Sequence, residues 1–178
     1  MKTKQIYLTV LFFPFFVHAS IFNSSSIVHP EVDKNGMVVS QHYLASSVGA
    51  QILKDGGNAY DASIAVAFAL AVVLPRAGNI GGGGFMVMYD EKTNKTFSID
   101  YREKAPALAS KDMYLNDDGT VNKKRAREGI LSIGVPGTVY GMWEVHKKFG
   151  SMPWKTLLKP AIRLAEEGFI MSPFMVDA

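Results

Sequence analysis

A chain of 178 residues is long enough to bury one hydrophobic core, and its 48% hydrophobic and 20% charged residues are typical of a globular protein. The formal net charge of +3 is too small to indicate binding to nucleic acid or to an anionic membrane. The basic residues over 123–127 have acidic neighbours, so we interpret this run as a solvated loop. The absence of cysteine excludes disulfide bonds.

The N-terminus has the pattern of a cleavable signal peptide. Lys2 and Lys4 precede an apolar run over 6–17, which is too short to span a bilayer, and the small-residue pattern Val17-His18-Ala19 follows. We therefore expect export to the periplasm or the medium.

This pattern also sets the expected domain organisation. Residues 1–19 would be removed, residues 20–36 would form a polar extension, and residues 37–178 would fold. An uncleaved anchor is the alternative, but Pro14 weakens the apolar run as a membrane helix, and we expect no stable membrane insertion.

The first elements of the folded part are predicted to be a short strand and two helices. We expect the strand over 37–40, and an apolar face repeating from Leu44 to Ile52 predicts a helix that ends at Gly56. Asn58 can cap a second helix over 59–74, with Asp61 near its positive end. This second helix is apolar nearly all round, which indicates burial on several sides, as in a layered sandwich.

A glycine cluster over 81–84 precedes two strand-like runs. It is not a phosphate cradle, because no Gly-Lys-Ser/Thr ending follows it and Met86 stands where dinucleotide spacing needs glycine. The two alternatives that remain are a tight structural turn and a place where a ligand or another chain comes close to the backbone.

The two runs, 85–89 and 96–101, are joined by a short polar connector and predict an antiparallel hairpin. Alternation along the second strand places Asp100 and Arg102 on one polar face. An arginine held beside a carboxylate can bind an incoming carboxylate through two parallel hydrogen bonds. The alternative is an ordinary solvated ion pair with Asp100 or Glu103.

The remaining elements are predicted to be turns and helices. Ser110 can cap a short helix through Tyr114, and residues 116–119 have the composition of a turn. A second turn over 134–137 leads into a helix over 138–149. An apolar stripe beginning at Trp154 has helical spacing and belongs to the core, but we expect Pro160 to divide it into two helices before Gly168 ends it.

Two observations concern catalysis. His29, His42 and His146 have no serine, cysteine or metal-ligand pattern around them, and His42 is placed to cap a helix. The chain contains no recognisable nucleophile.

Segments in series along the chain resemble the N-terminal part of γ-glutamyltransferases (γ-glutamyl transpeptidases). These segments are GGNAYDA (56–62), AGNIGGGGF (77–85), DYREKAP (100–106), GVPGTVYGM (134–142) and PAIRLAEEGF (160–169). The similarity runs in order from about Val38 to the last residue.

The resemblance implies an α+β fold, the N-terminal portion of an Ntn-hydrolase αββα four-layer sandwich, in a precursor that cleaves itself into a large and a small subunit. The arginine of the family motif D-x-R-E-x-A-P falls on Arg102 and binds the α-carboxylate of the γ-glutamyl substrate. The catalytic nucleophile is the threonine that begins the small subunit, which we expect beyond Ala178.

The activity so implied is γ-glutamyl transfer or hydrolysis on glutathione and related amides through a threonyl acyl-enzyme, with amino acids or peptides as acceptors and with no cofactor or metal. The present chain alone is expected to be inactive. Enzymes of the same architecture that act on glutaryl-cephalosporins or on poly-γ-glutamate remain alternatives, as does an exported, non-catalytic binding module.

Overall fold

The computed structural model describes residues 32–176. The chain divides between Asp33 and Lys34, and all elements belong to the second unit. The helices are α1 (Tyr43–Lys54), α2 (Ala59–Val73), α3 (Lys123–Arg127), the 3₁₀ helix η2 (Ile130–Ser132), α4 (Thr138–Phe149), α5 (Trp154–Glu167) and α6 (Pro173–Val176). The strands are β1 (Phe85–Asp90) and β2 (Lys95–Asp100). The predicted signal peptide lies outside the described residues, as does most of the predicted polar extension.

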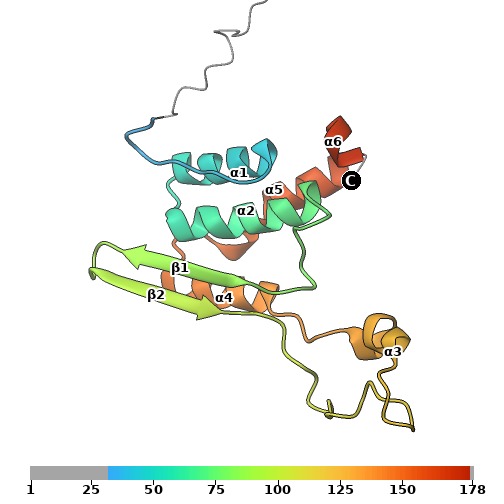
Figure 1. The fold of residues 1–178 in the computed structure, drawn as a ribbon. Helices are drawn as coiled ribbons and strands as arrows, with labels where there is room; N and C mark the ends of the chain where they lie inside the picture. Colours follow the sequence, from blue (N-terminus) through green and yellow to red (C-terminus); the bar gives the residue numbers. More distant parts are fainter. Residues whose placement is uncertain (1–31, 177–178) are drawn as a thin grey trace, which may run out of the picture. The chain divides into compact units, whose positions relative to one another are not determined.

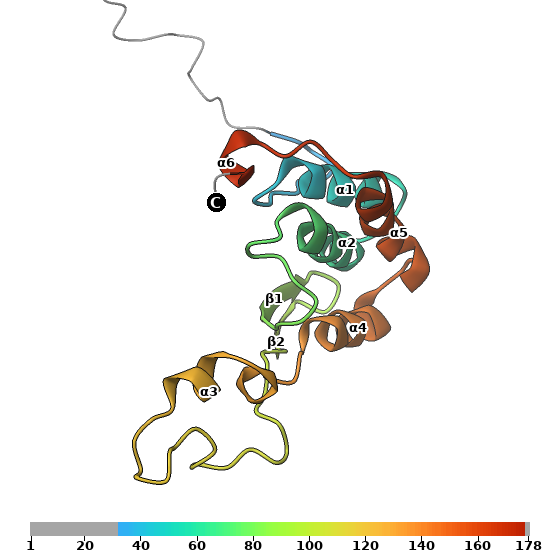
Figure 2. The ribbon, with the colours of Figure 1, turned by 90° about the vertical axis from the view of Figure 1, so that its right-hand side faces the viewer.

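The two strands form the predicted antiparallel hairpin, with Phe85 opposite Asp100 at the open end and Asp90 opposite Lys95 at the turn. Both views show α2 lying between α1 and this hairpin (Figures 1 and 2). The segment that carries α3 extends away from the hairpin and the other helices (Figure 2). The structure is α+β, as the sequence predicts.

The core lies between the helices and one face of the hairpin. The strand residues that point into it are Met86, Met88, Phe97 and Ile99, followed by Tyr101 just beyond β2, and they pack against buried residues of α2, α4 and α5. Ser98 and Asp100 are exposed on the opposite face. The predicted alternation along β2 is therefore confirmed.

The start of α2 ties two distant parts of the chain together. Asn58 caps the helix by accepting hydrogen bonds from the backbone amides of Tyr60 and Asp61, and Asp61 accepts one from the amide of Asn58 in return. Asp61 is fully buried, and its carboxylate also accepts hydrogen bonds from Ser151 and from the amide of Met152. The capping carboxylate thus holds the loop between α4 and α5 against α2.

The prediction of a strand over 37–40 is wrong. These residues form no ladder within the described part of the chain. Val38 instead packs on Gly49 of α1, and residues 37–39 line a hollow against α1 and α2. The apolar run over 37–39 reflects contact with helices rather than strand pairing.

Two predictions between the hairpin and α4 are also wrong. Residues 111–114 form turns and no helix, whereas residues 123–127, which we interpreted as a loop, form the short helix α3. Asn122 caps α3 through a 2.9 Å hydrogen bond from the amide of Arg125. The turn over 116–119 is confirmed, with Gly119 at φ 81°.

The expected division at Pro160 is absent, because α5 runs continuously from Trp154 to Glu167 with the proline inside it. Proline removes one backbone hydrogen bond, but Leu157 and Ala161 on either side of it are buried, and α5 packs along α2. Helix stability in proteins comes mostly from such packing. Gly168 ends the helix with φ 76°, as predicted.

No helix within residues 32–176 combines the length and the apolar character that crossing a membrane requires.

Candidate functional site

Arg102 lies two residues beyond the end of β2. The amide of Tyr101 still donates to the carbonyl of Gly84, at 3.0 Å, and so continues the pairing of the hairpin. The amide of Arg102 donates instead to Oδ1 of Asp100, at 2.9 Å. The chain therefore leaves the ladder at Arg102, whose side chain is exposed.

The glycine cluster and the turn before α4 meet beside this strand end. The carbonyl oxygen of Gly82 accepts hydrogen bonds from the amides of Gly137, at 2.7 Å, and Thr138, at 3.0 Å. This pair of bonds joins the two loops, which are more than fifty residues apart in the sequence. It also satisfies amides of the first turn of α4, which has no side-chain cap.

The backbone of residues 101 and 102 passes too close to the glycine cluster for a side chain to fit. A β-carbon at Gly83 would lie 2.5 Å from the carbonyl oxygen of Tyr101 and 2.6 Å from the Cα atom of Arg102. One at Gly84 would lie 3.0 Å from the ring of Tyr101. The glycines here let segments of this chain pack closely against the end of the hairpin, which is the tight structural turn, one of the two alternatives left open by the sequence. The approach of a ligand or another chain stays a prediction.

The Tyr101 ring packs on α4 where Gly141 leaves space, since a β-carbon at Gly141 would overlap the ring. The ring is half-buried, and burial raises the pKa of its phenol. The hydroxyl donates a long hydrogen bond of 3.4 Å to the carbonyl of Phe85. Tyr101 thus anchors the strand end to both α4 and β1.

A pocket of about 380 Å³ lies beside this anchored strand end. Its charged lining residues are Asp100, Arg102 and Lys104, and Tyr101 and Tyr140 also line it. Residues 135–137 close another side. Within the described chain, neither Asp100 nor Glu103 forms an ion pair with the Arg102 guanidinium. Two cationic side chains beside one carboxylate favour a ligand that carries negative charge.

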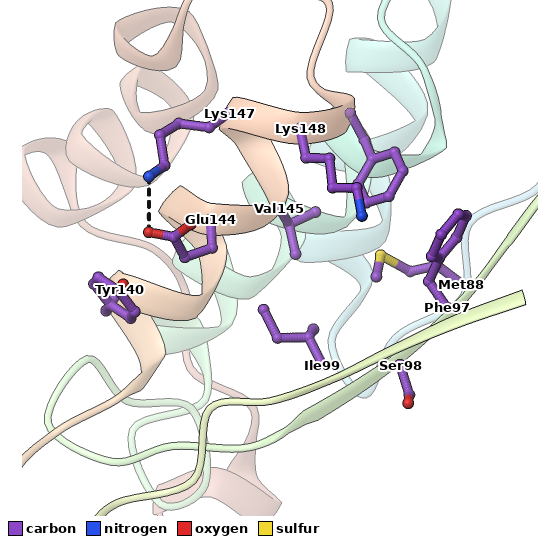
Figure 3. A pocket seen from close by; sticks show the side chains of 10 residues that line it. Met88, Phe97, Ser98, Ile99, Tyr140, Glu144, Val145, Lys147 and Lys148 are labelled. Atoms are coloured by element: carbon purple, nitrogen blue, oxygen red, sulfur yellow. Dashed lines mark ion pairs between the residues drawn. The ribbon is translucent and has the colours of Figure 1, made fainter.

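A second hollow lies between the hairpin and α4 (Figure 3). It shares the lining residues Ile99 and Tyr140 with the pocket beside Arg102. Along its rim, Glu144 and Lys147 form an ion pair of 2.8 Å. The hydrogen bond between them lowers the pKa of Glu144 and raises that of Lys147. Lys148 lies 4.7 Å from the centroid of the Phe97 ring. The charged groups on this rim already have partners within the chain, because Glu144 and Lys147 pair with each other and Lys148 lies over the Phe97 ring. We therefore place the candidate site at Arg102.

The histidines among the described residues make contacts that serve the fold. Nδ1 of His42 accepts a hydrogen bond from the amide of Leu44, so His42 caps α1 as predicted. His146 lies 2.8 Å through Nε2 from the carbonyl of Met152 and packs on Trp143 and Trp154. His29 lies outside the described residues. Across residues 32–176, no three acidic or histidine side chains gather in a way that could hold a metal ion.

Sequence reasoning identified Arg102 but missed Lys104, Tyr140 and the contacts of Tyr101. One indication was available. Gly137 and Gly141 are four residues apart at the start of a predicted helix, and that spacing exposes one face of a helix to close approach.

Comparison with solved structures gives the class of protein. The fold matches Ntn-hydrolases, namely γ-glutamyltranspeptidases and related acylases. The Helicobacter pylori γ-glutamyltranspeptidase aligns with a TM-score of 0.79 and 46% identity over 84% of this chain and 42% of that one. A cephalosporin acylase from Bacillus halodurans aligns with a TM-score of 0.68 and 31% identity over 88% of this chain and 29% of that one.

Sequence comparison gives the family. The family model described as gamma-glutamyltranspeptidase matches residues 45–178, so the chain belongs to the γ-glutamyltranspeptidase family. It is 49% identical to the glutathione hydrolase proenzyme of Pseudomonas aeruginosa over 160 residues, which are 90% of this chain and 28% of that protein. The chain spans about a quarter of the length of the curated relatives it matches, and it corresponds to their N-terminal part.

Proposed function

We propose that the full-length protein hydrolyses or transfers the γ-glutamyl group of glutathione and related γ-glutamyl amides. Family membership supports this activity, and so do relatives named as glutathione hydrolase proenzymes. The structural observation that supports a substrate-binding site on this chain is the pocket at the end of β2. It places Arg102, the arginine of the motif DYREKAP, where glycines hold the backbone from two sides.

Arg102 is the residue we assign to substrate binding. Its planar guanidinium donates two parallel hydrogen bonds to the α-carboxylate of the γ-glutamyl group. This contact orients the substrate and places the γ-carbonyl at the nucleophile, so Arg102 contributes position rather than chemistry.

The chemical steps belong to residues beyond Ala178. We assign them to a threonine that autocleavage leaves at the start of a small subunit. Its hydroxyl attacks the γ-carbonyl carbon while its own α-amine takes the hydroxyl proton. The acyl-enzyme forms as the amide C–N bond breaks and the donor's amine leaves with that proton. Water, an amino acid or a peptide then accepts the glutamyl group. This sequence of steps requires no cofactor.

Substitutions of Arg102 in the full-length enzyme test the binding role. Arg102→Lys keeps the charge but loses the fork, and Arg102→Gln loses both. A hydrogen bond to a charged group is worth about 1.5–3 kcal/mol, so we expect kcat/KM for γ-glutamyl-p-nitroanilide to fall about ten- to a hundred-fold or more. Subunit gels should show normal autocleavage. A normally processed Arg102→Gln enzyme with unchanged kcat/KM would rule out the role.

Acylases are the second candidate, because a cephalosporin acylase shares the fold. A glutaryl amide carries the same terminal carboxylate as a γ-glutamyl amide but lacks the α-amine, so Arg102 alone does not separate the two substrates. Comparing kcat/KM for γ-glutamyl and glutaryl anilides does separate them. A preference for the glutaryl compound would assign the protein to the acylases.

We also propose that the protein is exported and acts in the periplasm or the medium. The support is the sequence pattern of residues 1–19, with lysines, a short apolar run and Val-His-Ala. Mass spectrometry of the exported protein is expected to find an N-terminus at Ser20. An intact Met1 on the exported protein would contradict this.

A further inference from the structure

Asp100 contacts the backbone of Arg102 rather than its charged group. It is the last residue of β2, paired with Phe85, and its side chain is on the exposed face of the hairpin. Its Oδ1 atom accepts the amide hydrogen of Arg102 at 2.9 Å. This bond removes the Arg102 amide from strand pairing and fixes the direction in which the chain leaves the sheet.

We propose that Asp100 is a positioning residue for Arg102, acting through this backbone hydrogen bond. The inference rests on the substrate-binding role proposed for Arg102. In this role Asp100 keeps residue 102 turned so that its guanidinium reaches the pocket that both side chains line. The aspartate needs no contact with the substrate, and its charge is not what matters.

Backbone hydrogen bonds hold the chain on both sides of residue 102, from the amide of Tyr101 to the carbonyl of Gly84 and in both directions between Lys104 and Val135. The bond to Asp100 is the one that the amide of residue 102 itself makes. Gly83 lies against the Cα atom of Arg102, and Gly137 lies against the carbonyl group of Tyr101, with the carbonyl oxygen of Arg102 farther away. These are steric contacts, which limit how far the backbone moves but give it no preferred direction. The hydrogen bond from the amide to Asp100 is directional and links residue 102 to the end of the sheet. A displacement of about 1 Å in a substrate-positioning group can lower the rate about a hundred-fold.

The chain contains a matched control for this geometry. Oδ1 of Asp118 accepts the amide hydrogen of Thr120, also at 2.9 Å and also two residues along the chain. Asp118 Oδ1 also accepts the Thr120 hydroxyl at 2.6 Å, and the hydroxyl bond together with the amide bond lowers the pKa of Asp118. Asp118 lies in the turn over 116–119 and does not line the Arg102 pocket. Asp118→Ala therefore breaks the same kind of bond away from the site.

The test compares Asp100→Ala and Asp100→Asn in the full-length enzyme, with Asp118→Ala as control. Asparagine keeps an oxygen that accepts the Arg102 amide hydrogen but loses the charge. We expect Asp100→Ala to raise KM for γ-glutamyl-p-nitroanilide about tenfold or more, and Asp100→Asn and Asp118→Ala to stay within about threefold of wild type. Equal losses in the two Asp100 variants would point to charge and overturn the proposal. Wild-type KM in Asp100→Ala would overturn it as well.

Asp100→Ser provides a second comparison if Asp100→Ala does not mature into subunits. Its shorter hydroxyl accepts the same bond more weakly, so KM should lie above that of Asp100→Asn. A KM at or below that of Asp100→Asn would overturn the proposal.

A double-mutant cycle separates this inference from the binding role itself. If Asp100 acts through Arg102, Asp100→Ala should change KM by less than about twofold in an Arg102→Gln background. A full tenfold effect in that background would overturn the positioning role while leaving the role of Arg102 intact. If Arg102→Gln alone does not change KM, the proposed binding role of Arg102 is wrong. The single variant thus tests the binding role separately from the positioning role of Asp100.

Discussion

Gly137 lies against the carbonyl oxygen of Tyr101 so closely that a methyl group at residue 137 would overlap that atom. The glycine has φ −116°, a value that any residue adopts, so the requirement for glycine here is one of space and not of backbone conformation. Because residue 137 directly precedes α4 and residue 101 directly follows β2, this contact sets the distance between the helix and the strand end beside Arg102.

Gly137→Ala is therefore expected to push the end of β2 away from α4 and to displace Arg102. In the full-length enzyme, kcat/KM for γ-glutamyl-p-nitroanilide should fall at least about tenfold, because overpacking forces backbone shifts that cost about 1–3 kcal/mol. Circular dichroism should show whether the fold is kept.

Gly119→Ala is a control for the general effect of replacing a glycine. It strains a turn at φ 81° that has open space around it and no contact with the pocket. We expect it to lower stability without changing KM. A processed Gly137→Ala enzyme with wild-type KM would show that the spacing does not reach the binding site.

Tyr101 gives a prediction for alkaline pH. Burial raises the pKa of its phenol, so the folded protein holds this proton more tightly than the unfolded chain does. The stabilisation is complete below the unfolded value of about 10 and is lost as pH rises through the folded value.

Tyr101→Phe keeps the ring contact with Gly141 and removes the ionisable group. Urea unfolding between about pH 8 and pH 11 should then show a shallower loss of stability for the variant than for wild type. Tyr43→Phe, at an exposed position of α1, is the matched control. Identical alkaline profiles for wild type and Tyr101→Phe would contradict the assignment.

The sequence predicted most of the fold because its strongest patterns are local. The cap at Asn58, the helix stops at Gly56 and Gly168 and the alternation along β2 act within a few residues, and the structure confirms each of them. Arg102 was identified by resemblance to a family motif and not by any local physical pattern.

The features that were missed depend on contacts between distant segments. Pro160 does not interrupt α5 because packing on α2 compensates for one lost hydrogen bond, and residues 37–40 lie on helices instead of pairing as a strand. The convergence of Gly82 and Gly137 beside Tyr101 joins segments whose separation in sequence hides their proximity. Local propensity contains no information on such contacts.

The burial of Asp61 is another such feature, and it gives the last prediction. Its carboxylate is fully buried and accepts backbone hydrogen bonds from Asn58, Ser151 and Met152, at 3.0, 3.1 and 3.4 Å, together with one from the Ser151 hydroxyl. Asp61→Ala would leave these part-buried donors without their acceptor in the fold. Water can reach Ser151, which is exposed, so the penalty does not apply in full to every donor. An unsatisfied buried donor costs about 1–3 kcal/mol, and we expect a loss of stability of about that size.

Asp61→Asn should have a stability between those of Asp61→Ala and wild type. The asparagine amide presents one accepting oxygen and one donating NH₂ group to a site that contains only donors. Asp55→Ala is the control. It removes an exposed carboxylate from the end of α1 whose side-chain partner is Gln51, and we expect a change within about 0.5 kcal/mol. Urea or thermal unfolding of the full-length variants measures all three. If Asp61→Ala unfolds at the same denaturant concentration as Asp55→Ala, the buried carboxylate does not hold the α4–α5 loop in the way the hydrogen bonds indicate.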